Sequence, residues 1–215
     1  MRVTISDKYG MNDICPILWL DTAASTNSEL RQRMSGLENL SVVAARTQTA
    51  GRGQGAHTWH ASPGQNLTFS ILYRFEGACA LAAADTLLIT QVTTLALRDY
   101  LLEAGVQARI KWPNDIWVGE RKICGILIEN TLEGAAVRAS IVGIGFNLNE
   151  TGWPEELPNP VSLYELTGRR YDPGEELRRV RKEICRRFGQ LADSGGRKAL
   201  QEEFGKYLFR LPGAL

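Results

Sequence analysis

Short apolar runs separated by glycine- and polar-rich turns occupy the first two thirds of the chain, and a helical period replaces them in the last third. Runs of this kind predict β-strands. Gly119-Glu120 and Glu133-Gly134 are the predicted hairpin turns between late strands. The expected strands are Ile17–Leu20, Ser41–Arg46, Thr68–Tyr73, Ala108–Lys111, Ile116–Val118, Lys122–Glu129 and Val137–Phe146.

Two helices are predicted among these strands. Thr26 and Glu29 have the spacing of a capping box, and Gly36 suits a C-terminal stop, so a helix is expected between them. A longer helix is predicted over Leu81–Glu103, ending at Gly105.

The last third of the chain predicts helices only. Ser162 and Glu165 can cap a short helix, and Asp172 followed by Pro173 starts a longer one. The arginines of the longer helix are expected to form a solvated face. Its predicted apolar face is Leu177, Val180, Ile184, Phe188 and Leu191; a final helix is predicted over Arg197–Phe209, with Leu200, Phe204 and Leu208 on one side. Strands followed by helices indicate an α+β domain.

Composition narrows the class of protein. A chain of 215 residues favours one domain, and a net charge of +1 gives no argument for a DNA-binding surface. The four cysteines are far apart and form no CxxC pair, as expected of free thiols in a reducing compartment. No signal peptide is visible, and the one membrane-like segment, Ala78–Leu97, contains Asp85 and Gln91. A cytoplasmic protein is therefore expected.

A glycine-rich loop over Thr47–Leu67 is the most distinctive stretch. Gly51, Gly53 and Gly55 alternate around Arg52. Glycines allow backbone N–H groups to converge on an anion, with a guanidinium beside them. The alternative is a flexible surface loop without a ligand.

Three further stretches carry candidate chemistry. KWPND at Lys111–Asp115 places an aspartate in a turn, where it can hold a ribose hydroxyl or a metal ion, or merely cap the turn. RKICGILIE at Arg121–Glu129 places Lys122 at a strand start, where a lysine is usually solvated. GIGFNLN at Gly143–Asn149 has glycines inside a strand, which mark either close approach of a ligand or a bulge.

The order of these motifs resembles the catalytic domain of bacterial biotin protein ligases. The matching stretches are STN at Ser25–Asn27, QTAGRG at Gln48–Gly53, Trp59, Ser62, GQNL at Gly64–Leu67, KWPND, KICGILIE and GIGFNLN. The resemblance implies a mixed β-sheet packed against helices, forming one catalytic domain over residues 1–215. It also implies that the N-terminal helix-turn-helix domain of bifunctional relatives is missing, and that their small C-terminal β-barrel is absent or truncated.

The resemblance further implies an AMP-forming ligase with ATP and Mg²⁺. Biotin is activated to biotinyl-5′-adenylate with release of pyrophosphate, then transferred to a lysine of a biotin carboxyl carrier domain of a carboxylase. Neither nucleic acid nor membrane is an expected partner. Family members often dimerise through the sheet, which leaves a homodimer open, although no apolar stripe in the sequence argues for one.

Site residues follow from the resemblance position by position. Arg52 and Lys122 are the implied catalytic residues, and Asp115 is an implied metal ligand. The implied biotin-binding residues are Ser25, Thr26, Asn27, Gln48, Gly51, Arg52, Lys122, Gly125, Gly143 and Gly145. The implied ATP-binding residues are Gly53, Gln54, Trp59, Asn114, Asp115 and Asn147. Gln54 departs from the family, which commonly has an arginine there.

Two alternatives remain at this point. A lipoate–protein ligase shares the fold and the acyl-adenylate chemistry, but its arginine-pair and triple-glycine signature is not found. A non-catalytic biotin or adenylate sensor belongs to another class, and the joint presence of Arg52, Lys122 and Asp115 argues against it.

Overall fold

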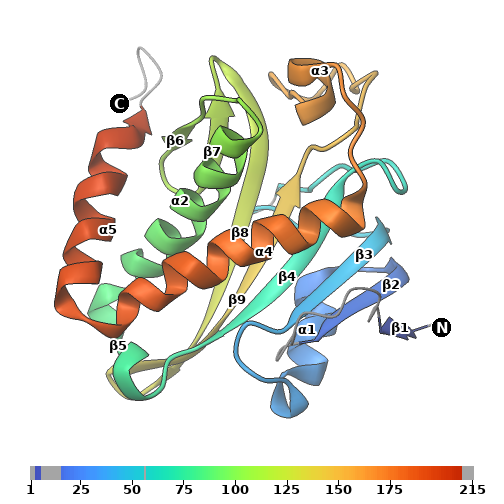
Figure 1. The fold of residues 1–215 in the computed structure, drawn as a ribbon. Coiled ribbons are helices and arrows are strands. Elements are labelled where there is room, and N and C mark those ends of the chain that lie inside the picture. Colours follow the sequence, from blue (N-terminus) through green and yellow to red (C-terminus); the bar gives the residue numbers. More distant parts are fainter. Residues whose placement is uncertain (1–2, 6–15, 56, 210–215) are drawn as a thin grey trace.

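A mixed sheet runs through the molecule, and the computed structural model describes residues 3–5, 16–55 and 57–209 (Figure 1). Within these residues the strand order is β1-β2-β3-β4-β9-β8-β7-β6-β10, with the short β5 paired to β9. Among the strands that the structure describes, β2–β3 and β6–β10 are the pairs that run parallel. The strands are β1 Val3–Ile5, β2 Ile17–Ala23, β3 Val42–Gln48, β4 Leu67–Arg74, β5 Leu81–Ala82, β6 Arg109–Lys111, β7 Asp115–Val118, β8 Arg121–Glu133, β9 Ala136–Phe146 and β10 Leu208–Phe209.

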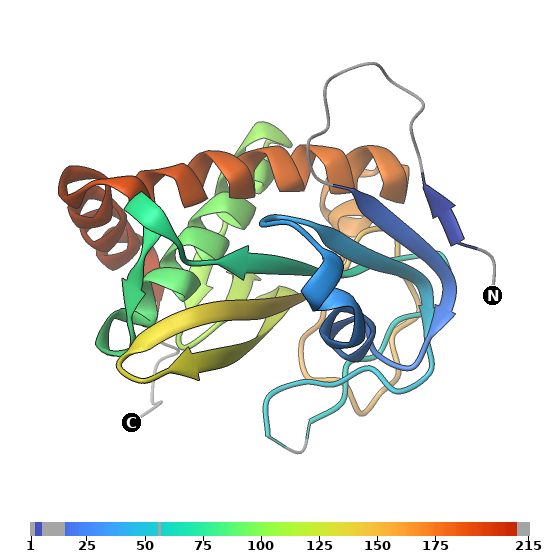
Figure 2. The same cartoon turned by 90° about the horizontal axis from the view of Figure 1, so that it is seen from below.

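Helices cover both faces of the sheet unequally. Figure 2 shows α4 and α5 on one side of the sheet, while α1 lies on the other, beside the cyan loop that joins β3 to β4. The helices are α1 Thr26–Arg33, α2 Leu87–Glu103, α3 Leu163–Thr167, α4 Pro173–Gly189 and α5 Ser194–Tyr207. The expected α+β architecture, a mixed sheet packed against helices, is confirmed. Among the described residues, no helix combines the length and apolar character needed to cross a bilayer.

Period-two alternation along the strands divides the interior into two cores. On β3, Val42 and Ala44 face the large core under α2, α4 and α5, whereas Val43 and Ala45 face a smaller core that includes Leu30 of α1. Successive side chains of a strand point to opposite faces, so the same alternation decides which residues can reach the site. The α1 face is the one left open for a ligand.

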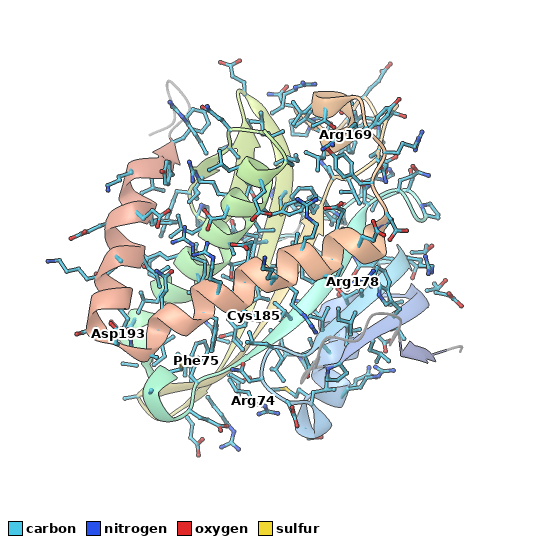
Figure 3. The ribbon with its side chains drawn as sticks, in the orientation of Figure 1. Arg74, Phe75, Arg169, Arg178, Cys185 and Asp193 are labelled. Atoms are coloured by element: carbon cyan, nitrogen blue, oxygen red, sulfur yellow. The ribbon has the colours of Figure 1, made fainter. Side chains whose placement is uncertain are left out.

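The helical layer is held by apolar packing and by ion pairs. All five residues predicted for the apolar face of α4 are buried, but α4 ends before Leu191, which lies in the 3₁₀ turn that follows the helix. Phe75, labelled beneath α4 in Figure 3, packs on Phe188 with ring centroids 5.9 Å apart. The prediction that the arginines of α4 are solvated is wrong for Arg181 and Arg187, which are buried. Arg187 is paired with carboxylates of the two neighbouring helices, which makes its burial tolerable.

Three predicted boundaries need correction. The long helix begins at Leu87 rather than Leu81, because Leu81 pairs with Val137 of β9 and a 3₁₀ turn follows. The final helix runs over Ser194–Tyr207 rather than Arg197–Phe209, because the two residues after Tyr207 pair with β6 as β10, where Leu208 is 41% exposed. The predicted capping box at Thr26 is absent, and Ser25 is the N-cap without a side-chain bond.

The two N-caps predicted for helices in the last third of the chain are confirmed. Ser162 and Glu165 form a reciprocal capping box on α3, and the Asp172 carboxylate accepts a hydrogen bond from the backbone N–H of Glu175 at the start of α4. These signals involve only local contacts, which explains why the sequence alone predicts them.

Candidate active site

A cavity of about 570 Å³ opens on the α1 face of the sheet. A volume of this size suits a small organic ligand or a nucleotide. Its walls come from five segments that are distant in sequence: the start of α1, the β3–β4 loop, the β6–β7 turn, the paired strands β8 and β9, and the loop around residues 158–159. The segments with candidate chemistry are thereby brought together at one place.

The glycine loop folds into a small hairpin over this cavity. Arg52 forms a bridge with Thr58, and the backbone N–H of Trp59 donates to the carbonyl of Gly51 at 2.9 Å. The N–H of Gly53 donates to the carbonyl of His57 at 2.7 Å. These two amides are therefore satisfied within the loop, and the expected convergence of loop N–H groups on an anion does not include them. The loop presents the side chain of Arg52 to the cavity instead.

Glycines of β8 and β9 form a floor on which the indole of Trp59 lies. A Cβ atom built at Gly145 would lie 2.2 Å from Trp59 Cε2, and one at Gly125 would lie 3.0 Å from Trp59 Cζ3. Contacts below 3 Å are not tolerated, so only glycine at position 145 admits the indole in this position. The indole Nε1 is buried and has no protein hydrogen-bond partner. Burying an unpaired donor costs free energy, which a ligand acceptor could recover.

A lysine–aspartate pair lies beside the same floor, next to Gly125. Lys122 Nζ is 2.8 Å from Asp115 Oδ1, and both side chains are partly exposed. The same ammonium lies 5.9 Å from the centre of the Trp59 ring. Asn114 joins the β6–β7 turn to β8. Its side-chain Nδ2 donates to the backbone carbonyl of Ile126, and its backbone carbonyl accepts a hydrogen bond from the Ile126 N–H. The turn thus holds Asp115 against Lys122.

The STN segment is fixed by buried hydrogen bonds at the opposite wall. The backbone N–H of Thr26 donates to Gln48 Oε1 at 2.7 Å, which ties α1 to the end of β3. Ser70 Oγ lies 2.5 Å from Asn27 Oδ1, and this contact orients the amide. Asn27 in turn fills the space beside Gly143, where a Cβ would lie 2.2 Å from Asn27 Oδ1. Gly143 therefore makes room for a protein side chain.

Glu129 of β8 accepts hydrogen bonds from residues of two walls. Its carboxylate accepts a hydrogen bond from Asn27 Nδ2 at 2.7 Å and one from each terminal nitrogen of Arg52 at 3.2 Å. Arg31 lies 3.5 Å away as a second cation. Partial burial opposes ionisation of this carboxyl group, but the Asn27 hydrogen bond and the Arg52 and Arg31 charges outweigh it and hold the pKa of Glu129 below its ordinary value.

Most of the predicted site residues line this cavity. The exceptions are Gly51, which belongs to a neighbouring hollow under the loop, and Asn147. Asn147 is buried, and its Nδ2 donates to the carbonyls of Lys122 and Val161. The structure therefore gives Asn147 a place behind Lys122 rather than at the cavity wall. The predicted residues that line the cavity are Ser25, Thr26, Asn27, Gln48, Arg52, Gly53, Gln54, Trp59, Asn114, Asp115, Lys122, Gly125, Gly143 and Gly145.

Several lining residues were not predicted. Trp112 and Leu127 lie inside motifs that were recognised, and strand alternation from Gly125 indicates that Leu127 shares its face. Pro158 and Asn159 come from the proline-rich loop, where no sequence signal marked them. The Asn159 carbonyl accepts the N–H of Lys122 at 2.7 Å, so this loop reaches the site by pairing with the start of β8.

The glycine-floored cavity presents a guanidinium and an ammonium, and such a cavity suits an anionic ligand. The chain belongs to the biotin/lipoate A/B protein ligase family, whose model matches residues 20–147. It is 38% identical over 180 residues to the biotin–[acetyl-CoA-carboxylase] ligase of Paracoccus denitrificans, covering 80% of this chain and 72% of that protein.

Two other relatives agree with this family. The bifunctional ligase/repressor BirA of Bacillus subtilis is 35% identical over 134 residues, which cover 61% of this chain and 40% of that protein. The biotin protein ligase of Aquifex aeolicus, solved in complex with biotin and ATP, superposes with a TM-score of 0.75 at 28% identity, covering 91% of this chain and 79% of that one.

Proposed function

We propose that this chain is an ATP-dependent biotin–protein ligase. It activates biotin to biotinyl-5′-adenylate, releases pyrophosphate, and transfers the biotinyl group to a lysine of a carboxylase carrier domain. The observation that carries the proposal is the meeting of Arg52 and Lys122, from separate segments, around one glycine-floored cavity. The biotin ligases among its relatives support biotin as the acid, rather than lipoate.

The activation step requires two anions to approach each other. The biotin carboxylate attacks the α-phosphate of ATP, forming a carbon–oxygen–phosphorus anhydride as the bond to the pyrophosphate oxygen breaks. Fixed positive charge around the α-phosphate lowers this barrier, and no proton transfer is needed because the carboxylate is already ionised. Lys122 of β8 and Arg52 of the glycine loop, which both line the cavity, are proposed to supply that charge.

The biotin ring is assigned to the wall formed by the STN segment and Gln48. Ser25, Thr26 and Gln48 are proposed to contact the ureido group, and all three line the cavity. The glycine floor is partly covered by Trp59 in the present structure. The proposed tail path along Gly125 and Gly145 therefore requires the indole to move aside or to form one wall of the tail channel.

The nucleotide is assigned to the end near the β6–β7 turn. Trp59 is proposed to pack near the adenine, with Gly53, Gln54 and Asn114 beside the nucleotide. The buried, unpaired Trp59 Nε1 supports a polar ligand group there. Gln54 brings no charge to this wall, so the adenylate is held by fewer cations than in relatives with arginine.

Magnesium is proposed to enter with ATP. Mg²⁺ is usually held by one or two carboxylates together with substrate phosphates and water. Asp115 is the carboxylate that lines the cavity and fits this requirement, whereas no cluster of three or more His, Cys, Asp or Glu side chains is found in residues 3–5, 16–55 and 57–209. The ion would neutralise part of the phosphate charge.

Exchange of radiolabelled pyrophosphate into ATP tests the first step. Exchange that depends on biotin is expected, with none in the presence of lipoate or without an acid. Exchange supported only by lipoate would identify a lipoate ligase, and no exchange despite biotin binding would identify a sensor. Transfer is tested by incubating the chain with a purified biotin carboxyl carrier domain and detecting biotin on its lysine.

The cellular setting is part of the same proposal. A biotin-dependent carboxylase in the cytoplasm would provide the carrier domain. The family resemblance leaves a homodimer open. Sedimentation of the chain with and without biotin and ATP measures its assembly state directly.

A further inference from the structure

Glu129 ends the KICGILIE motif, and the proposed chemistry gives it no role. It lies on the same face of β8 as Gly125 and Leu127, because alternate residues of a strand share a face. Its carboxylate lines the hollow under the glycine loop, which measures about 430 Å³, and not the main cavity. Arg52 lines both spaces. The guanidinium therefore lies at the boundary, with Glu129 behind it as seen from the substrate cavity.

We propose that Glu129 is a positioning residue that holds Arg52 at the edge of the substrate cavity before the substrate arrives. The inference rests on the proposed function, in which Arg52 binds the biotin carboxylate and the adenylate. Glu129 would not touch either ligand and would act through Arg52.

The hydrogen bonds leave Arg52 able to bind an anion. A guanidinium has five N–H donors. Glu129 engages one terminal nitrogen with each carboxylate oxygen, at 3.2 Å, which leaves the remaining donors for a ligand. The two-point contact also fixes the plane of the guanidinium.

The charges around Glu129 indicate that it positions Arg52 without neutralising the site. One carboxylate, Glu129, is shared by two cations, Arg52 and Arg31. The group therefore keeps a net positive charge, which favours an approaching anion. Asn27 holds the carboxylate from the other wall at 2.7 Å, so Glu129 is itself fixed by the STN segment.

The size of the effect is modest, because Arg52 and Glu129 side chains are 45% and 23% exposed. Partly exposed ion pairs contribute little, so the pair raises the closed fraction of the loop without locking it. The apparent affinity of a ligand falls in proportion to the competent fraction of the protein. Replacing Glu129 should therefore weaken biotin binding by about three- to tenfold.

The test compares Glu129→Gln with Glu133→Gln. Glu133 is on the same strand and forms an exposed ion pair with Arg138, away from the cavity, so it controls for the loss of one carboxylate. In biotin-dependent pyrophosphate exchange, Glu129→Gln should raise the KM for biotin about three- to tenfold and leave kcat nearly unchanged, because saturating biotin closes the loop. Glu133→Gln should change neither.

A double-mutant cycle shows whether the effect passes through Arg52. In an Arg52→Gln background, Glu129→Gln should produce no further rise in the KM for biotin. An equal rise in both backgrounds would overturn the proposal, because Glu129 would then act independently of Arg52. An unchanged or lowered KM in the single variant would also overturn it, a lowered KM meaning that Glu129 competes with biotin for Arg52.

A ligand-free measurement separates this proposal from the proposed function. Amide hydrogen exchange of the loop should be faster in Glu129→Gln than in Glu133→Gln, most clearly at the hairpin amides of Gly53 and Trp59. If the wild-type chain shows no biotin-dependent pyrophosphate exchange, the proposed function fails, while amide hydrogen exchange still tests Glu129. Equal hydrogen exchange of the loop in the two variants would refute the positioning role of Glu129. Should Glu129→Gln not fold, Arg52→Lys keeps the charge but not the two-point contact, and the same acceleration is required.

Discussion

In the proposed function, the activation step depends most directly on Lys122. Its ammonium lies 2.8 Å from Asp115 and faces the cavity, where negative charge accumulates as biotin attacks ATP. Removal of one preorganised donor to a developing charge costs roughly 100- to 1000-fold in rate. Lys122→Ala should therefore lower the rate of biotin-dependent pyrophosphate exchange by about that factor.

Folding of the Lys122→Ala variant should be preserved. Both partners of the ion pair are partly exposed, and such pairs contribute about 0–1 kcal/mol to stability. Lys198→Ala, at an exposed position of α5, is the matched control for both measurements. Rate and melting temperature are measured on the same preparations. A near-normal rate, or an unfolded protein, would show that Lys122 does not have the role assigned to it.

Gly145 gives a second prediction at the scale of one atom. A Cβ added there would overlap the Trp59 ring, so Gly145→Ala must displace the indole and the loop that carries it. Forcing an extra methyl group into a packed site costs about 1–3 kcal/mol. A lower melting temperature and loss of biotin-dependent exchange are expected. Gly36→Ala is the control, since nothing lies within 4 Å of the added Cβ; equal behaviour of the two variants would refute the close packing.

Sequence motifs predicted individual site residues better than they predicted their partners. Arg52 and Lys122 were identified by their motifs, and both line the cavity. The contact of Arg52 with Glu129, 77 positions away, could not be read from either motif. Asn147 was expected at the nucleotide, yet its amide is used by two backbone carbonyls. Side-chain partners depend on the fold, and one sequence shows only residue types.

At the scale of elements, the proposed function makes turnover depend most on the β3–β4 loop. It is held by the Arg52–Glu129 pair, by a few internal hydrogen bonds and by Trp59 on the glycine floor. Fixing each residue costs about 1–2 kcal/mol of backbone entropy, and glycine loses the most freedom. We expect the loop to open readily without ligand and to close over biotin and ATP.

Amide hydrogen exchange across Gly51–His60 measures this closure. Protection should increase when biotin and ATP are both present, because the ligand anions add contacts to Arg52 and stabilise the closed loop. The closed loop would in turn shield the anhydride from water. The amides of α4 serve as an internal reference that should not change. Equal protection of the loop with and without ligands would show that the lid is preformed, contrary to this prediction.

The sequence predicted the positions of elements correctly where local signals determine them. The predictions were wrong where pairing with a distant strand determines the structure. The N-terminal part of α4 was predicted from Asp172, Pro173 and its apolar face, all of which are local. The start of α2 was predicted too early, because Leu81 pairs with β9, more than fifty residues away. β10 was missed for the same reason, since it forms only by pairing with β6.

At the scale of the whole molecule, the α+β class followed from the order of strands and helices, and the mixed sheet from the family resemblance. The strand order did not, because the pairing of β4 with β9 leaves no trace in either strand taken alone. The ion pairs between helices were likewise unexpected. A run of arginines on α4 looks solvated in the sequence, and only the packing of α2 and α5 around it shows which of them are buried.

Arg187 therefore gives a prediction about the stability of the helical layer. It is buried on α4 and paired with Asp99 of α2 at 2.7 Å and with Glu203 of α5 at 2.5 Å. Removing one partner of a buried pair leaves uncompensated charge and costs about 3–5 kcal/mol, of which the lower end applies here because the carboxylates are partly exposed. Arg187→Met should unfold at lower urea than the wild type, whereas Arg138→Gln, which breaks an exposed pair, should not.

The same pair predicts how this difference varies with pH. The hydrogen bond from Arg187, aided by its charge, outweighs burial and holds the pKa of the Glu203 carboxyl below its ordinary value. Such a group contributes stability above its unfolded-state pKa and loses that contribution as the pH falls through the lower folded-state pKa. The stability gap between wild type and Arg187→Met should therefore be full at neutral pH and narrow in acid. Urea titrations of both proteins across this range measure the gap, and a gap that stays constant or widens in acid would mean that Glu203 does not contribute through its charge.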